Sequence, residues 1–408
     1  MPSLNSSAEK QEYLDALFTG EERFPLLNGG MGIDFTDETF VAEMARQRRI
    51  GVFAFSAPGY RVLENDLSHM TPQQRVQTLR ASNQCAIAQK TQHVRDQHEH
   101  AIVGANVMKI LEDYPATIED IIASKRIDIL FVGAGLPRDL LKRMAQDDAK
   151  HMRYVPIISS AGIAELFEKL ADRGKGKRPD AYYVELPQFA GGHLGVLKGQ
   201  DPNDTDTFDP VRIREELQGI APGRPVILAG GIAYRDQVQA AFDEGYQGAA
   251  MGTRLLLTQE SGLSDGISRD MYLDPSRDVC VDAHSPTGYM ARRLDVACTE
   301  RTAESVRQAI RNCVSCVKAR DCEFCKNASA TNGELQQPED PHYCIARDLT
   351  STRLGIAKIC FTGSQIVTIR HDPLYESDGE RYVPTLAEAL EYALNHDAPQ
   401  GAQGLQVR

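Results

Sequence analysis

The residues of this chain that are best suited to chemistry stand directly after short apolar runs. His193 is the clearest of them, because it follows two glycines in the sequence Ala190-Gly191-Gly192-His193. An imidazole with an ordinary pKa of about 6.5 can take a proton from carbon or donate one, provided that it is directed into a cavity. The glycines could instead serve to fit a ligand, with the histidine only lining the site. We predict that His193 is the catalytic acid–base group.

Two further pairs of small residues predict a phosphate site. Gly230 and Gly231 end one apolar run, and Gly252 with Thr253 ends the next. Glycine lets the backbone approach an anion closely, and backbone N–H groups together with the Thr253 hydroxyl supply donors. Either pair alone would usually be a tight turn between a strand and a helix. Their occurrence after consecutive runs favours the phosphate of a mononucleotide cofactor, because barrels of alternating strands and helices bind phosphate there.

Five cysteines form a second group of candidate ligands. Their spacing is Cys313-x2-Cys316-x5-Cys322-x2-Cys325, followed by Cys344. The two CxxC pairs are closer together than is usual for one zinc ion, whereas an iron–sulfur cluster is larger and tolerates crowded ligands. We therefore predict a cluster on Cys313, Cys316, Cys322 and Cys344, with Cys325 as the competing fourth ligand. Zinc is the alternative metal, and unmetallated thiols packed in the core are a third interpretation.

The elements that must position these residues follow a regular alternation. Short apolar runs rich in β-branched or aromatic residues alternate with amphipathic segments such as 36–49 and 162–174. The runs are continuously apolar, as expected for parallel strands buried on both faces. This pattern favours an α/β fold, a closed (β/α)8 TIM barrel, over a doubly wound open sheet. The predicted strands are residues 24–28, 51–55, 101–107, 128–133, 154–159, 181–185, 225–230 and 248–252.

The same alternation divides the chain into regions. We expect an N-terminal helical extension over residues 1–21 and a TIM barrel over residues 22–262, which would bind the mononucleotide cofactor and carry an insertion at 56–100. The alternation then stops, so residues 263–400 are expected to be an appended C-terminal region that carries the cysteine cluster and packs on the barrel. Residues 401–408 are expected to be a tail.

Composition excludes several classes of partner. The 408 residues carry a net charge of −12 without a long basic stretch, which argues against nucleic acid and anionic membranes as partners. No run of apolar residues is long enough to span a bilayer. An odd number of cysteines without an evident signal peptide predicts reduced thiols and a cytoplasmic location. A small-molecule substrate is the expected partner, and a homo-oligomer is compatible with the sequence.

A resemblance to a known family is carried by the runs PLLNGGMG, GANVM, AGGHLG, ILAGGI, GAAMGTRLLLTQES and SPTGYMARR. They resemble the nitronate monooxygenase (2-nitropropane dioxygenase) family, which includes related FMN-dependent enoyl-acyl-carrier-protein reductases. The resemblance implies an FMN-binding TIM barrel with His193 as catalytic base or proton donor. The segment VELPQFAGGH is one residue longer than the family's usual pattern, so the pocket is expected to differ in shape. The residues expected to surround FMN are Asn28, Gly29, Gly30, Met31, Asn106, Ser159, Gly191, Gly192, Gly230, Gly231, Gly252 and Thr253.

Together these features lead to an expected reaction. His193 deprotonates a carbon acid next to an electron-withdrawing group, and the electrons pass through FMN to O₂. A first alternative reverses the flow: NAD(P)H reduces FMN, which reduces a conjugated, enoyl-thioester-like substrate, and an iron–sulfur cluster would favour this direction. A second alternative is a flavin-free barrel that acts as an isomerase or lyase on a phosphorylated metabolite. A third is a non-catalytic partner subunit whose cysteine region binds other proteins. The pocket wall is expected to come from the insertion at 56–100 and a loop at 194–210.

Overall fold

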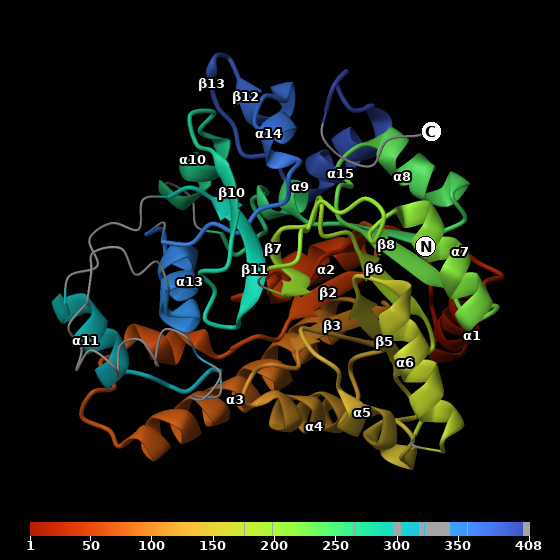
Figure 1. The fold of residues 1–408 in the computed structure, drawn as a ribbon, viewed down its shortest axis with the longest axis horizontal. Helices are drawn as coiled ribbons and strands as arrows, with labels where there is room; N and C mark the ends of the chain where they lie inside the picture. The colour runs from red at the N-terminus through yellow and green to blue at the C-terminus, as the bar shows by residue number, and fades with distance from the viewer. Residues whose placement is uncertain are drawn as a thin grey trace.

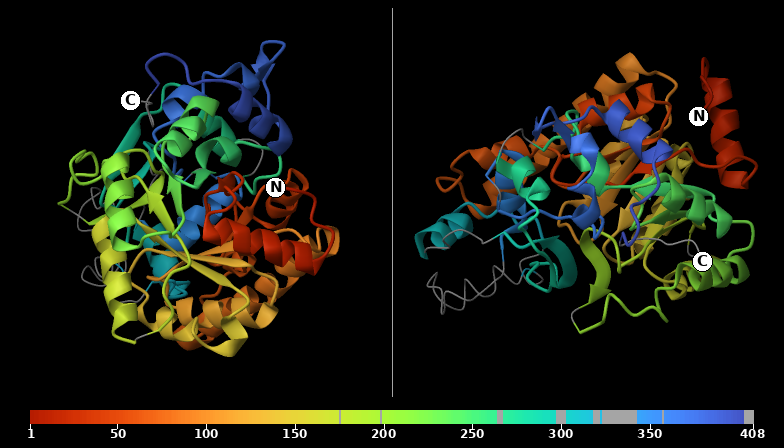
Figure 2. Two further views of the ribbon diagram at one scale, coloured as in Figure 1. Left: turned by 90° about the vertical axis from the view of Figure 1, so that its right-hand side faces the viewer. Right: turned by 90° about the horizontal axis from the view of Figure 1, so that it is seen from above.

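The computed structural model places eight parallel strands in a barrel surrounded by helices (Figures 1 and 2). The predicted TIM-barrel fold class is therefore confirmed, and each of the eight predicted runs overlaps one strand. A parallel bridge between Leu27 and Ile50 joins the first two strands, so the sheet closes on itself. The residues that the structure describes are 1–174, 176–197, 199–263, 267–296, 303–317, 322, 343–356 and 358–402. The barrel strands, each beside the next, are β1 (Leu27–Asn28), β9 (Gly248–Met251), β8 (Val226–Ala229), β6 (Tyr182–Glu185), β5 (Arg153–Ile158), β4 (Ile129–Gly133), β3 (Val103–Met108) and β2 (Gly51–Ala54).

Helices connect the strands and cover the outside of the barrel (Figure 2). Their first turns are capped by side chains that satisfy free N–H groups: Asp37 accepts hydrogen bonds from Thr39 and Phe40, and Thr71 forms a capping box with Gln74. No helix in the described part of the chain is long and apolar enough to cross a membrane. The helices and short 3-10 helices of the barrel are α2 (Glu38–Arg46), η1 (Tyr60–Glu64), α3 (Pro72–Gln97), α4 (Tyr114–Ser124), α5 (Arg138–Arg143), η2 (Asp147–Ala149), α6 (Ala161–Asp172), α7 (Pro210–Ile220), α8 (Arg235–Asp243) and α9 (Thr253–Leu256).

Side chains fill the inside of the barrel, and an N-terminal helix covers one end of it. This helix is α1 (Ser7–Thr19), whose Leu14 and Leu17 belong to one buried cluster with interior residues such as Ile129 and Ile227. The covered end is the one at which the strands begin. A ligand site must therefore lie at the other end, where the strands finish.

The appended region adds an antiparallel sheet beside the barrel (Figure 1). The chain leaves β6 and enters β7 (Gly192–Leu197), which pairs with β11 (Tyr289–Leu294); β11 also pairs with β10 (Val279–Asp282). The expectation of a loop over residues 194–210 is thus wrong in its first part, because the partner strand lies far along the chain and leaves no local signal. The remaining elements are α10 (Ile267–Leu273), α11 (Ala303–Arg311), α13 (Ile345–Arg353), α14 (Ile366–Ile369), η3 (Pro373–Tyr375), β12 (Glu376–Ser377), β13 (Glu380–Arg381) and α15 (Leu386–Asn395).

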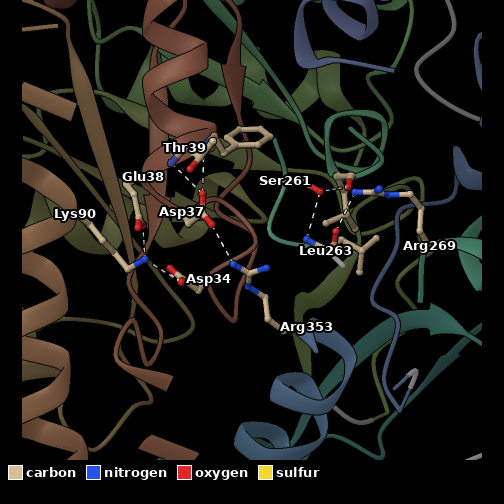
Figure 3. Close-up of polar contacts among 11 residues, drawn as sticks. Asp34, Asp37, Glu38, Thr39, Lys90, Ser261, Leu263, Arg269 and Arg353 are labelled. Atoms are coloured by element: carbon tan, nitrogen blue, oxygen red, sulfur yellow. Dashed lines mark hydrogen bonds and ion pairs between the residues drawn. The ribbon is translucent and has the colours of Figure 1, made fainter. Parts of the chain in front are cut away.

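A network of ion pairs fastens the appended region to the barrel helices (Figure 3). Arg353 of α13 donates a hydrogen bond to Asp37, at the start of α2, over 3.0 Å. Lys90 of α3 donates to Asp34, also over 3.0 Å, and to Glu38. All five side chains are largely buried, apart from that of Glu38, which is one-third exposed. Helices α2, α3 and α13 are therefore held together by charges as well as by apolar packing.

A second, fully buried ion pair joins α9 to the segment before η3. Arg254 and Asp372 are 2.6 Å apart, and their side chains are 0% and 4% exposed. Asp372 also accepts a hydrogen bond from the Tyr234 hydroxyl over 2.9 Å, and the Arg254 guanidinium lies 4.5 Å from the centre of the Tyr234 ring. A buried pair of this kind adds little net stability, but removal of one partner leaves the other charge without compensation.

We predict that Asp372→Ala lowers the free energy of unfolding by about 3–5 kcal/mol, because Arg254 would remain charged in an apolar environment. The matched control is Asp397→Ala. Asp397 pairs with Arg235 over 2.7 Å at the surface, where both side chains are half-exposed, so its loss should cost less than about 1 kcal/mol. Urea unfolding of the two variants measures the difference. Equal losses of unfolding free energy in the two variants would show that the buried ion pair matters no more for stability than the exposed one.

Candidate active site

A cavity of about 770 Å³ lies at the carboxyl ends of the barrel strands. This is within the range of sites that bind cofactors and small molecules. Residues that the sequence placed after six separate runs meet on its walls. All the predicted catalytic and cofactor-binding residues line it except Asn28: they are Gly29, Gly30, Met31, Asn106, Ser159, Gly191, Gly192, His193, Gly230, Gly231, Gly252 and Thr253.

Asn28 has a structural position instead. Its Nδ2 donates hydrogen bonds to the carbonyls of Val52 (2.8 Å) and Gly29 (2.9 Å), and its Oδ1 accepts from the Val52 N–H over 2.8 Å. The side chain is 1% exposed and its amide is used by the backbone. Asn28 therefore joins β1 to β2 at the seam of the barrel, and it does not line the large cavity.

The glycines of the cavity wall are required by close approaches of the backbone. A Cβ atom on Gly30 would lie 2.5 Å from the side chain of Asn106. Gly230 and Gly231 have φ angles of +86° and +80°, and a Cβ atom on Gly230 would lie 2.8 Å from the carbonyl oxygen of Leu186. Such positions leave bare backbone facing the cavity. The wall can thus accept a flat ring on the Gly30 side and an anion beside the glycine pair.

His193 lies in β7, opposite Ala291 of β11. Its Nε2 is 2.6 Å from the Ser285 hydroxyl, which is in turn 2.8 Å from the Thr287 hydroxyl. The ring of Phe361 packs edge-on against the imidazole, with 5.3 Å between ring centres. Burial lowers the pKa of His193 to about 4. The imidazole is therefore neutral at physiological pH and able to accept a proton.

Arg292 holds the segment that leads to His193. It is 4% exposed and donates hydrogen bonds from one nitrogen to the carbonyls of Pro187 (3.0 Å) and Ala190. Burial lowers the pKa of Arg292 to about 10, so it remains a cation at neutral pH. This segment belongs to VELPQFAGGH, in which the sequence comparison with the family pattern indicated one extra residue. Arg292 fixes its path by bonding two of its backbone carbonyls.

Glu185 contributes a carboxyl group to the cavity wall. It ends β6 opposite Ala229, and side-chain alternation along the strand places it on the interior face together with Tyr183. Burial raises the pKa of Glu185 to about 7. The group can therefore be protonated or charged near neutral pH, according to what lies beside it.

The four predicted cysteine ligands are brought together on the wall of a second, small cavity. They are Cys313, Cys316, Cys322 and Cys344, whereas Cys325 lies outside the described residues. Burial, with Cys313 and Cys322 nearby, raises the pKa of the Cys316 thiol to about 12. Among the described residues, no group of three or more His, Cys, Asp or Glu side chains has the arrangement that holds a metal ion. The structure thus brings these four cysteines together, and their role as metal ligands stays a prediction.

The cysteine cavity shares a wall with the large cavity. Cys316 lines both, as do its neighbours Val314 and Ser315 and the facing residues Ile345 and Ala346. The two cavities therefore adjoin at these residues. Any group held by the cysteines would lie next to a ligand in the large cavity.

Three parts of the site were not singled out from the sequence. Glu185 ends a predicted strand in the same way as the predicted residues, so its position was an available signal. Ser285 and Arg292 fall within the run SPTGYMARR, which carried the resemblance but no assigned role. The third part is the segment 361–365, which has no distinctive local pattern.

Comparison with known proteins agrees with this geometry. The nitronate monooxygenase family model matches residues 16–342. A protein of Mycobacterium tuberculosis described as a monooxygenase, Rv1533, is 28% identical over 176 residues; the match spans 42% of this chain and 41% of that protein, less than half of its length.

Solved structures share the fold. FabK from Thermotoga maritima has a TM-score of 0.59 and 17% identity, with 93% of this chain and 94% of that chain covered. The enoyl reductase domain of MlnA from Bacillus amyloliquefaciens has a TM-score of 0.55 and 13% identity, with 96% of each chain covered. Nitroalkane oxidase from Streptomyces ansochromogenes has a TM-score of 0.54 and 16% identity, with 92% of this chain and 97% of that chain covered. At these identities the likeness shows the fold alone.

The family model includes every residue of the large cavity that the sequence predicted, from Gly29 to Thr253. It also covers Cys313, Cys316 and Cys322, and ends just before Cys344. Because this model matches most of the chain, the resemblance is confirmed: the chain belongs to the nitronate monooxygenase family.

Proposed function

We propose that this chain is an FMN-dependent oxidoreductase, resembling nitronate monooxygenase, in which His193 removes a proton from a carbon acid. One observation carries the proposal. A neutral imidazole lies on one wall of the large cavity, and the glycine pairs at 230–231 and 252–253 lie on another wall of the same cavity. The proposed general base and the proposed phosphate site would thus share one cavity, as a flavin enzyme of this kind requires.

The residues present fit FMN. Gly230, Gly231, Gly252 and Thr253 would hold the phosphate with backbone N–H groups and a hydroxyl, and Gly30 would let the flat ring lie against backbone. The sequence contains no GxGxxG turn between a strand and a helix, which a dinucleotide pyrophosphate would require. When bound, FMN would supply the acceptor for the two electrons that the carbon acid gives up, with O₂ as the proposed final acceptor.

The chain itself would handle the proton. The neutral His193 imidazole takes the proton from carbon, and the Ser285 hydroxyl, 2.6 Å away, fixes the orientation of the ring. The apolar edge of Phe361 limits access of water to the same ring. Glu185 is the second group in the cavity that can hold a proton near neutral pH.

The first test is His193→Ala. If His193 moves a proton in the transition state, kcat should fall by roughly 10²–10⁴ while flavin stays bound. His151→Ala, at an exposed histidine, is the control and should leave turnover unchanged. Loss of flavin with unchanged turnover per bound flavin would assign His193 a structural role instead.

The acid limb of the pH profile gives a second prediction. Because burial lowers the pKa of His193 to about 4, the base is lost only as pH falls through about 4, well below an ordinary histidine pKa of about 6.5. The profile of kcat/KM against pH measures this in the free enzyme. Glu185→Gln serves as the control, since it removes the other cavity group, whose pKa is about 7. An acid limb near about 6.5 that persists in that variant would contradict a buried, neutral base.

A reductase is the second candidate function. It would take electrons from NAD(P)H and reduce a conjugated, enoyl-thioester-like substrate. Two observations favour it: apolar side chains that include Leu136, Ile163 and the exposed Leu166 line the large cavity, and Cys316 lines both this cavity and the cysteine cavity. Consumption of NAD(P)H without oxygen would support the reductase, and substrate oxidation coupled to O₂ uptake would support the monooxygenase. A colourless purified protein would instead favour the flavin-free barrel.

We further propose that Cys313, Cys316, Cys322 and Cys344 bind an iron–sulfur cluster. The support is that these residues, which are separated in the sequence, line one cavity. The sulfur atoms around an iron–sulfur cluster lie further apart than those around a single zinc ion. The lack of a single-ion site among the described residues therefore counts more against a zinc ion than against a cluster. Metal binding would also explain why thiols with raised pKa values are gathered, because a metal converts them to thiolates at pH 7.

The test is Cys316→Ser. If a cluster is bound, iron and sulfide content should fall together with the thermal stability of the appended region, because the ligands would no longer pin it. Cys85→Ser is the control, since Cys85 is exposed on α3. Elemental analysis of protein prepared without oxygen decides the outcome: stoichiometric zinc without iron would contradict the cluster, and the absence of any metal would contradict both metals.

A further inference from the structure

The segment 361–365 of the appended region closes one corner of the large cavity. Thr362, Gly363 and Gln365 line this cavity together with Gly231 and Thr253. The segment thus lies against the same residues that are proposed to hold a phosphate, although it is more than 100 residues away from them in the sequence. No role was assigned to it from the sequence.

Two hydrogen bonds connect the segment to the phosphate corner. The Gly363 N–H donates to the Thr253 hydroxyl oxygen over 2.8 Å, and the Gln365 amide nitrogen donates to the Gly231 carbonyl over 3.2 Å. Gln365 is 3% exposed, so this contact is shielded from solvent. Each hydrogen bond therefore contacts one of the two residue pairs, Gly230–Gly231 and Gly252–Thr253, that are predicted to hold the phosphate.

The first bond orients the Thr253 hydroxyl. A hydroxyl group has one hydrogen to donate and two lone pairs. Because Gly363 occupies a lone pair of Thr253, the hydroxyl hydrogen remains available for an acceptor in the cavity. The second bond engages the carbonyl of Gly231, whose oxygen would otherwise repel an anion. Both contacts make the corner a better donor site for a phosphate.

The packing of the segment is close enough to make this arrangement rigid. The Ser364 N–H donates to the Phe189 carbonyl over 3.0 Å, just before the glycines that lead to His193. A Cβ atom on Gly191 would lie 2.5 Å from the backbone carbon of Thr362, and one on Gly363 would lie 3.0 Å from the Thr253 hydroxyl. Glycine is thus needed on both sides of the contact.

We infer that the segment 361–365 is part of the cofactor site and that it positions Gly231 and Thr253 to bind the phosphate of FMN. This inference rests on the proposed function and extends it. The corner has neutral donors only: among the described residues that line the cavity, the one cationic side chain is Arg80, on α3. A negative charge placed in the segment would therefore meet the phosphate without compensation.

The test is Gln365→Glu, with FMN and riboflavin as the two probes. The variant loses the donor to Gly231 and gains a negative charge at the corner, so we expect FMN affinity to fall by about 100-fold. Riboflavin lacks the phosphate, and its affinity should be almost unchanged. Val367→Glu is the matched control, because it adds the same charge to α14 at a side chain that is 43% exposed. It should leave the affinity for both flavins unchanged.

Quenching of flavin fluorescence on binding measures these affinities. Unaltered FMN binding by Gln365→Glu, or equal losses of FMN and riboflavin affinity, would overturn the inference while the wild type still binds FMN. Failure of the wild type to bind any flavin would overturn the proposed function and the inference with it.

Hydrogen exchange on the wild-type protein provides a test that does not depend on the folding of a variant. FMN should slow exchange of the backbone amides of residues 363–365 more than riboflavin does. Equal protection by the two flavins would overturn the inference.

Discussion

The pairing of β7 with β11 determines where His193 lies. The strand that carries the histidine is outside the barrel sheet, and its partner, Ala291, belongs to the appended region. Ser285, just before β11, contacts the imidazole, and Arg292 holds the segment before it. A reacting group displaced by about 1 Å can cost about 100-fold in rate. The position of the proposed base thus depends on residues that lie almost 100 positions further along the chain.

The barrel and the appended region supply different parts of the site. The strand ends provide the backbone proposed to accept a flat ring and an anion, while the appended region supplies Ser285 beside the histidine and the segment 361–365 beside Thr253. The same region brings four cysteines to the wall of the cavity. Ion pairs such as Arg254–Asp372 and Arg353–Asp37 hold the two parts together. The complete site therefore needs the appended region in its docked position.

The sequence predicted the parts of this structure that depend on local pattern. The barrel strands were found as continuous apolar runs. The pairs Gly230–Gly231 and Gly252–Thr253 were predicted as a phosphate site because glycine lets the backbone approach an anion closely. The position of Asn28 outside the cavity wall could not be predicted, because nothing local reveals that its amide would bond to Val52, on the neighbouring strand. For the same reason the strand character of β7 and the contact of Gly363 with Thr253 could not be predicted. Both are created by residues distant in sequence, and neither has a periodicity of its own.

The central claim is that the glycine corner of the large cavity holds the phosphate of FMN beside His193. The most direct measurement is the identity of the cofactor that acid releases from freshly purified protein, determined by chromatography against authentic flavins. We predict that FMN is released, in an amount close to one molecule per chain. Release of free FAD, or protein that contains no flavin and does not bind FMN when it is added, would contradict the claim.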